Sequence, residues 1–257
     1  MSTLAKSSLL QISGKLAGIF FGLGTFYILL HFFGTEGYGV FTTALTYVTF
    51  FSIVVDFGLT ITTAQMIAEK GADEKRILSN LFALRVVSAL IFMTLAPLSA
   101  WFLPGNEKIF PLICIGSATY FFGAISQMFI GVFQKRLELV TPVLAEMGSR
   151  ALALVGVLFV GLTTRSLAHA TIAFAVGALL QVLIMLVATH RRISLRFSWD
   201  FSLWKEIISR SWPIGLSIFF NLLYLKGDVL FLWAMGKTDV EIGHYGAAYK
   251  VVDILTM

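Results

Sequence analysis

Charged residues are scarce in this chain: they make up 13% of its 257 residues, whereas hydrophobic residues make up 58%. A soluble protein of this length needs far more polar surface to cover its core, so the composition excludes an ordinary soluble domain. Apolar stretches long enough to span a bilayer, which takes roughly 20 residues, recur along the whole sequence. The sequence therefore predicts an all-α polytopic membrane protein.

Cysteine and histidine are also rare. The single cysteine, Cys114, excludes an intrachain disulfide and any CxxC metal or redox motif. The four histidines show no metal-ligand spacing, so we predict no metal site, no cofactor and no catalytic residues. The N-terminus carries Lys6 and Lys15, but no A-x-A-like cleavage site accompanies the apolar run that follows. This pattern predicts a retained first span rather than a cleaved signal.

The sequence contains no long polar loop. Its longest interruption, "HRRISLRFSWDFSLWKE" at 190–206, has 17 residues, and its only acidic residues are Asp200 and Glu206. A membrane glycosyltransferase or polymerase usually needs a sizeable extramembrane loop that carries acid, base or metal groups. We therefore predict that the protein is not an enzyme, and we keep a glycosyltransferase or polymerase only as a minor alternative.

Eight apolar segments are predicted to cross the membrane. With the N-terminus placed inside, the inside segments and adjoining ends hold 12 basic residues, and the outside segments hold three. This bias predicts a cytoplasmic N-terminus, and it attributes the net charge of +5 to topology rather than to nucleic-acid binding. The predicted spans are 9–33, 39–68, 77–103, 109–133, 139–162, 167–189, 207–235 and 240–257.

A short motif occurs twice, once after the first span and once after the seventh. The copies read "EGYGVFTTALTYV" and "EIGHYGAAYKVV", and they align when Gly39 is set on Gly243, which also sets Phe41 on Tyr245. Each copy opens an inward-running span after a short outside loop. The implied period is about six spans, and transporters are often built from such halves, with the substrate site at their interface.

This period divides the chain into three parts. We predict a six-helix N-terminal lobe at 1–189, a cytoplasmic linker at 190–206, and the first two helices of an incomplete second lobe at 207–257. The linker mixes arginines with aromatic residues. It is interpreted either as an interfacial segment that lies on anionic lipid or as an ordinary basic loop.

Eight charged residues lie within the predicted spans and away from their ends. Charges at this depth are costly, so they normally face a bundle interior or a water-filled cavity. A cluster of basic side chains in a bundle suits an anionic ligand such as a pyrophosphate, while the acids are candidates for charge balance or for H⁺ or Na⁺ coupling. The substrate-binding candidates are Arg85, Arg150, Lys226 and Lys250, and the acidic candidates are Asp56, Glu146, Asp228 and Asp253.

Glu146 and Arg150 are four residues apart in one predicted span, so they share a helix face and can pair. Arg150 is placed close to the membrane midplane. Two interpretations stay open: the two residues form a structural pair between packed helices, or Arg150 lines a cavity and Glu146 balances its charge.

Two stretches of the sequence resemble parts of a known transporter family. "FFGTEGYGVFTTALTYVTFFSIVVDFGLT" resembles the first-loop and second-span region of Wzx-type polysaccharide (O-antigen) flippases, and "SWPIGLSIFFNLLYLKGDVLFLWAMGKTDVEIGHYGAAYKVVDIL" resembles their seventh and eighth spans. These flippases belong to the multidrug, oligosaccharidyl-lipid and polysaccharide exporter superfamily. The resemblance covers essentially the whole chain, and the matching residues of the second stretch are Pro213, Gly215, Asp228, Gly243, Tyr245, Ala248 and Tyr249.

The resemblance implies a two-lobed bundle of twelve or fourteen helices in the bacterial inner membrane. It implies alternating access that moves undecaprenyl-pyrophosphate-linked oligosaccharides outward for polysaccharide or lipopolysaccharide biosynthesis, with the lipid-linked oligosaccharide and membrane lipids as partners. This chain lacks at least four of those spans, so we predict that its second lobe is truncated. A cation-coupled multidrug exporter of the same superfamily stays an alternative. The sugar, the coupling ion and the oligomeric state stay open.

Overall fold

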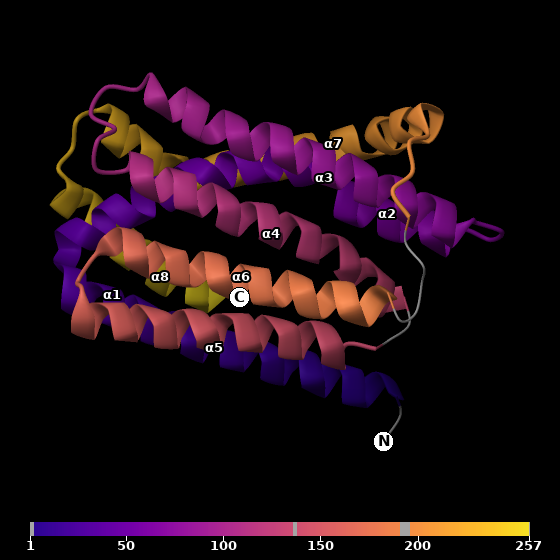
Figure 1. Cartoon of the computed structure of the whole chain (residues 1–257), viewed down its shortest axis with the longest axis horizontal. Helices are drawn as coiled ribbons and strands as arrows, with labels where there is room; N and C mark the ends of the chain where they lie inside the picture. The colour runs from indigo at the N-terminus through magenta and orange to yellow at the C-terminus, as the bar shows by residue number, and fades with distance from the viewer. Residues whose placement is uncertain (1–2, 136–137, 191–195, 257) are drawn as a thin grey trace.

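The computed structural model describes residues 3–135, 138–190 and 196–256; within these ranges it describes all side chains except those of 3–10, 131, 134–135 and 251–256. The described residues form helices and no strands, which confirms the prediction of an all-α, multi-pass membrane protein. Most of the helices run along one common direction (Figure 1). They are α1 (Thr3–Asp56), α2 (Leu59–Ala68), α3 (Glu74–Trp101), α4 (Phe110–Lys135), α5 (Val140–Thr163), α6 (Leu167–His190), α7 (Phe201–Ala234) and α8 (Asp239–Thr256).

Six stretches of the described residues are long and apolar enough to cross a membrane. The first of them, Gln11–Ala68, has 58 residues, and it contains two of the predicted spans because the chain folds back within it. The predicted eighth span, 240–257, is not tested by this finding, because the side chains of α8 are described only as far as Lys250.

Gly34 reverses the direction of α1. Its φ of 68° and ψ of −177° lie in a region that side chains with a Cβ atom rarely enter, so glycine permits the reversal within one residue. Figure 1 shows the first arm of α1 running away from the N-terminus and the second arm returning. The gap predicted between the spans 9–33 and 39–68 is therefore reduced to Gly34, because helical backbone continues directly on both sides of it.

A second break divides the predicted span 39–68. Helix α1 ends at Asp56, and α2 begins at Leu59, after Gly58 with a φ of 79°. A Cβ atom on Gly58 would lie 2.8 Å from the carbonyl oxygen of Ser211 in α7. The break therefore occurs where α7 crosses at backbone distance, and a glycine is needed there for both its conformation and its size.

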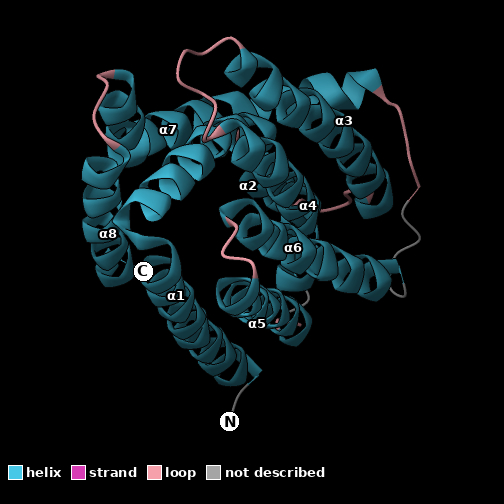
Figure 2. Ribbon diagram, turned by 60° about the vertical axis from the view of Figure 1, so that its left-hand side comes forward, coloured by secondary structure: helices cyan, strands magenta, loops and turns pink. Residues whose placement is uncertain are grey.

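Most of the helix ends lie at two opposite ends of the bundle (Figure 1). One of them, which we call the Gly34 end, holds the reversal of α1 and the connections α3–α4, α5–α6 and α7–α8. The other, the N-terminal end, holds the start of α1 and the ends of α2, α4 and α6. The first arm of α1 lies beside α5, and α6 lies against both α5 and α4 (Figure 2). Helix α7 packs on α2 and α1, and α8 packs along α1.

The two copies of the repeated motif contact each other reciprocally. A Cβ atom on Gly39 would lie 1.8 Å from the carbonyl oxygen of Asp239, and one on Gly243 would lie 2.0 Å from that of Thr35. Asp239 precedes Gly243 by four residues, as Thr35 precedes Gly39, so each glycine faces the same position of the other copy. A two-fold relation between the copies produces this reciprocity, and it agrees with the alignment of the two glycines in the sequence.

Three charged side chains, Lys108, Glu36 and Asp239, form ion pairs in the same region, at the Gly34 end. The ammonium group of Lys108, in the α3–α4 connection, donates to Glu36 at 2.8 Å and to Asp239 at 3.0 Å. Both carboxylates raise the pKa of Lys108, and Lys108 in turn lowers the pKa of Glu36. The two ion pairs of Lys108 thus connect the second arm of α1 to the start of α8 at the exposed surface of the bundle.

Helix α7 begins inside the segment 190–206 that was predicted as a linker, because Asp200 caps it. Its carboxylate accepts a hydrogen bond from the backbone N–H of Leu203 at 3.1 Å and pairs with Arg76 at 2.5 Å. The side-chain oxygen of Asn80 accepts from the backbone N–H of Asp200 at 2.7 Å. These contacts fix the first turn of α7 on α3. Residues 191–195 of the predicted linker lie outside the described part of the chain.

Replacing Asp200 with alanine is expected to lower the midpoint of thermal unfolding slightly at pH 7. The hydrogen bond from Arg76 and that from Leu203 hold the pKa of Asp200 below its ordinary value. The contribution is therefore present above the ordinary pKa of aspartate and disappears as pH falls through the lowered folded-state value. Unfolding of wild type and variant in detergent at several pH values measures this. Asp200→Asn, which keeps a capping oxygen but not the charge, should lie between them.

Candidate functional site

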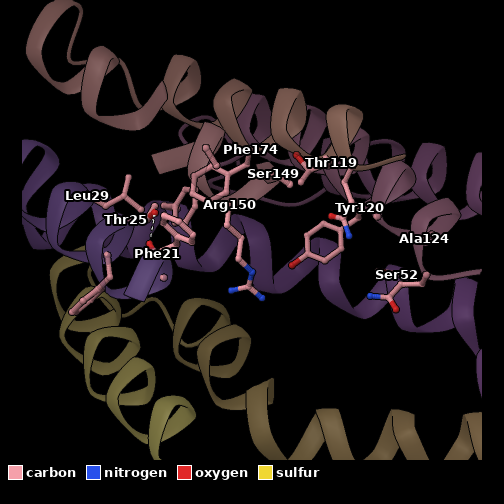
Figure 3. Close-up of a pocket in the computed structure, with 18 of the residues that line it drawn as sticks. Phe21, Thr25, Leu29, Ser52, Thr119, Tyr120, Ala124, Ser149, Arg150 and Phe174 are labelled. Atoms are coloured by element: carbon pink, nitrogen blue, oxygen red, sulfur yellow. Dashed lines mark hydrogen bonds between the residues drawn. The ribbon is translucent and has the colours of Figure 1, made fainter. Parts of the chain in front are cut away.

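A cavity of about 710 Å³ lies inside the bundle, and we call it the main cavity. It is bounded by both arms of α1, by α2 to α6 and by one residue of α8. Figure 3 shows side chains from α1, α4, α5 and α6 converging on it, with Arg150 and Tyr120 extending into the open space. Four of the candidate residues line it together: Asp56, Arg85, Arg150 and Lys250.

Arg85 forms the deepest charged part of this wall. Its side chain is 1% exposed, and its guanidinium group pairs with Asp56 and donates to the hydroxyl of Thr60 at 2.9 Å and to the carbonyl oxygen of Ala124 at 3.0 Å. Thr60 also donates to Asp56, at 2.5 Å. Arg85 thus links α3 to α4 and to both sides of the break between α1 and α2, and the carboxylate of Asp56, 34% exposed, faces the cavity.

Arg150 projects from α5 and is much more accessible. It donates two hydrogen bonds to Glu146, at 2.7 and 3.0 Å, and one to the carbonyl oxygen of Gly18 in α1 at 3.2 Å. The pairing inferred from the spacing of four residues is therefore present. Arg150 also lines a second cavity of about 450 Å³, which Glu146, Lys15 and Gly18 help to enclose. We call this second cavity the α1–α5 groove.

Lys250, like Arg150, lines two cavities. It lines both the main cavity and a third cavity of about 230 Å³ between α1, α4, α7 and α8. Lys226 lines this third cavity as well, and its ammonium group lies 5.2 Å from the centre of the Tyr249 ring, in a cation–π position. The structure therefore brings all four basic candidates to three adjoining cavities.

Of the other two acidic candidates, Asp228 is not among the residues that line the three cavities. The carboxylate of Asp228 accepts hydrogen bonds from Tyr245 at 2.6 Å and from Tyr249 at 3.4 Å, which joins α7 to α8. The side chain of Asp253 lies outside the described part of the structure. Among the described residues, no group of three or more histidine, cysteine, aspartate or glutamate side chains could hold a metal ion.

The three cavities have an excess of positive charge. Among the described side chains, five basic residues line them, namely the four basic candidates and Lys15, and two acidic residues do so, Asp56 and Glu146. Each acid is already paired with an arginine. The linings therefore carry a net positive charge, and an anionic group that enters these cavities meets several hydrogen-bond donors in surroundings of low dielectric constant.

Uncharged polar residues of the main cavity were missed in the sequence. Thr119, Gly123 and Gln127 follow one another at intervals of four residues along α4, and Gln181 faces them from α6. Regular spacing of small and polar residues within a span is the signal that could have found them, because polar groups in spans normally face the bundle interior. They add hydrogen-bonding groups suited to hydroxyl-rich ligands.

One known protein family matches nearly the entire chain. The family model described as "Polysaccharide biosynthesis protein" matches residues 4–257. No curated protein matches the chain.

Two solved structures share its fold. One is a multidrug resistance MATE-family transporter of the MOP superfamily in an inward-facing conformation, with a TM-score of 0.68 and 15% identity over 95% of this chain and 60% of that one. The other is the MATE multidrug transporter DinF-BH, solved as a complex, with a TM-score of 0.65 and 12% identity over 98% of this chain and 60% of that one. The chain thus spans about 60% of the length of these transporters.

Proposed function

Because the chain belongs to the polysaccharide biosynthesis protein family, we propose that it forms the first lobe and the start of the second lobe of a lipid-linked oligosaccharide flippase. The cargo is an undecaprenyl-pyrophosphate-linked oligosaccharide, which the protein moves across the bacterial inner membrane by alternating access. The role is transport and not catalysis. The fold shared with MOP-superfamily transporters supports this mode of action.

The observation that carries the proposal is the excess of positive charge in the three cavities. A pyrophosphate has several acceptor oxygens and more than one negative charge, and Arg150, Lys226 and Lys250 offer matching donors from two sides. Glutamine and threonine side chains in the main cavity suit the hydroxyl groups of a sugar. A cavity for cationic drugs would instead need an excess of acidic groups, so the charge favours anionic cargo.

The orientation follows from the distribution of basic residues outside the spans. The N-terminal end carries most of them, while the Gly34 end carries Lys108, Arg165 and Lys237. We therefore place the N-terminal end in the cytoplasm and the Gly34 end outside. Asp56 and Glu146 are proposed to balance charge, and a proton or a sodium ion could drive the cycle through either carboxylate.

Deletion of the gene tests this function directly in a strain without a redundant flippase. Surface polysaccharide should disappear and lipid-linked repeat units should accumulate, and a plasmid copy should restore export. Normal export without accumulation would contradict the proposal. If the deletion instead sensitises cells to cationic drugs while export stays normal, the protein is a multidrug exporter.

Arg150→Ala is expected to reduce export roughly tenfold or more without preventing membrane insertion, since a hydrogen bond to a charged group contributes about 1.5–3 kcal/mol. The side chain is 41% exposed, so its loss leaves little buried surface unfilled. Export of lipid-linked units per amount of inserted protein is the measurement. Arg165→Ala, in the exposed α5–α6 connection, is the matched control and should export normally. Full activity of Arg150→Ala would show that the Glu146 pair serves packing only.

A further inference from the structure

The α1–α5 groove differs in character from the main cavity, although Arg150 borders both. Apolar side chains such as Ile19, Val143 and Met147 provide most of its lining, and Gln11 is the one uncharged polar side chain among the described lining residues, whereas the main cavity presents several hydroxyl and amide groups. The largely apolar α1–α5 groove therefore meets the more polar main cavity at the guanidinium group of Arg150. This arrangement matches an amphiphile whose charged head lies at the boundary and whose two parts extend in opposite directions.

Two glycines on α1 keep the groove open beside Arg150. A Cβ atom on Gly14 would lie 2.8 Å from the side chain of Val143, and one on Gly18 would lie 3.4 Å from the guanidinium carbon of Arg150. The two glycines are four residues apart, so they share the face of α1 that faces α5. Any larger side chain at these positions would enter the groove or push the two helices apart.

The residues that flank the groove are apolar and exposed. Ile12 and Leu16 on α1 are 55% and 63% exposed, and Val140 and Leu144 on α5 are 54% and 58% exposed. In a protein that crosses a bilayer, such side chains contact lipid. The groove therefore lies next to the hydrocarbon region, on the half of the bundle nearer the N-terminal end.

Arg150 retains donors for a ligand at this boundary. Its guanidinium group has five N–H donors, and three of them are used in the bonds to Glu146 and Gly18. Lys15 adds a second positive charge to the lining of the groove. A pyrophosphate next to Arg150 would meet both charges, and the chain attached to it could follow the groove to the lipid.

We propose that the α1–α5 groove holds the first isoprene units of a polyprenyl-pyrophosphate lipid, with the pyrophosphate at Arg150 and the first sugar in the main cavity. This inference rests on the proposed function and adds a path by which the lipid tail leaves the protein. The cargo then crosses the wall of the bundle between α1 and α5 and remains attached to the bilayer.

Photolabelling tests the groove on the unaltered protein. The probe is a polyprenyl-pyrophosphate sugar with a diazirine on its first isoprene units, incorporated with the protein into vesicles. Label is expected on peptides that contain Gly14 to Ile19 and Leu139 to Met147, and unlabelled polyprenyl pyrophosphate should remove it while inorganic pyrophosphate should not. Label spread over lipid-facing residues such as Val155, without enrichment at the groove, would overturn the inference.

A substitution that fills the groove provides a second test in cells. Gly14→Leu should reduce export about tenfold, whereas Gly148→Leu, where a Cβ atom would meet nothing within 4 Å, should export normally. If Gly14→Leu is not inserted, photolabelling of the unaltered protein decides. Normal export by inserted Gly14→Leu in a strain whose export depends on the gene would overturn the groove alone. Normal export after deletion of the gene would overturn the proposed function itself.

Discussion

Replacement of Arg85 by methionine is expected to destabilise the folded protein by about 3–5 kcal/mol, the cost of removing one partner from a buried ion pair. The side chain is 1% exposed, and methionine fills much of its volume but donates to neither Asp56 nor the carbonyl oxygen of Ala124. Because Asp56 is 34% exposed to the cavity, water offsets part of the cost, and we expect the lower part of this range. The midpoint of thermal unfolding in detergent, followed by tryptophan fluorescence, measures the effect.

Two further variants separate charge from packing in this experiment. Arg150→Met makes the same chemical change at a side chain that is 41% exposed, so it should lose export but little stability. In the double variant Asp56→Asn with Arg85→Met no unpaired charge remains, and part of the stability should return. An unfolding midpoint of Arg85→Met equal to that of wild type would mean that the pair does not hold α2, α3 and α4 together.

Replacement of Gly39 by alanine is expected to force α1 and α8 apart. The new methyl group would lie 1.8 Å from the carbonyl oxygen of Asp239 and 2.9 Å from the backbone nitrogen of Gly243, and neither atom can move without its helix. Overpacking typically costs about 1–3 kcal/mol, and a clash with backbone is expected at the upper end of that range. The unfolding midpoint and the export rate should both fall. Gly243→Ala should have a similar effect, because its methyl group would lie 2.0 Å from the carbonyl oxygen of Thr35.

Gly148→Ala is the matched control for the two glycine variants. It makes the same change within a helix, and a Cβ atom there would meet no atom within 4 Å. Alanine has a higher helix propensity than glycine by about 1 kcal/mol, so the control should be as stable as wild type or slightly more stable. If Gly39→Ala behaves like Gly148→Ala, the two helices do not approach as closely as their backbones indicate.

Features that depend on local sequence could be predicted. The apolar segments indicated the helices of the bundle, and the interval of four residues indicated the pairing of Glu146 with Arg150, which the structure shows at 2.7 Å. The two copies of the repeated motif indicated that Gly39 and Gly243 are equivalent, and the structure shows their reciprocal contact. Helical periodicity and short repeated motifs can be recognised in the sequence because each lies within a single helix.

Features that depend on distant segments could not be predicted. The break before α2 occurs where α7 crosses, and Gly58 and Ser211, which meet there, are far apart in the chain. The pairing of Arg85 with Asp56 joins different helices, and no spacing rule relates them. Helix α7 begins earlier than its apolar run because Asp200 caps it, a polar signal that hydrophobicity does not detect. The binding roles of the charged candidates stay predictions.

The reciprocal glycine contact lies near one membrane face and not at the middle of the helices. If α8 tilts about the contact between Gly39 and Gly243, each of its residues moves in proportion to its distance from Gly243. The last residue of the helix, Thr256, is about 20 Å away at a rise of 1.5 Å per residue, so a tilt of about 10° would sweep it through an arc of about 3.5 Å. A small change of angle at the glycine contact therefore produces a larger displacement of the residues farther along α8.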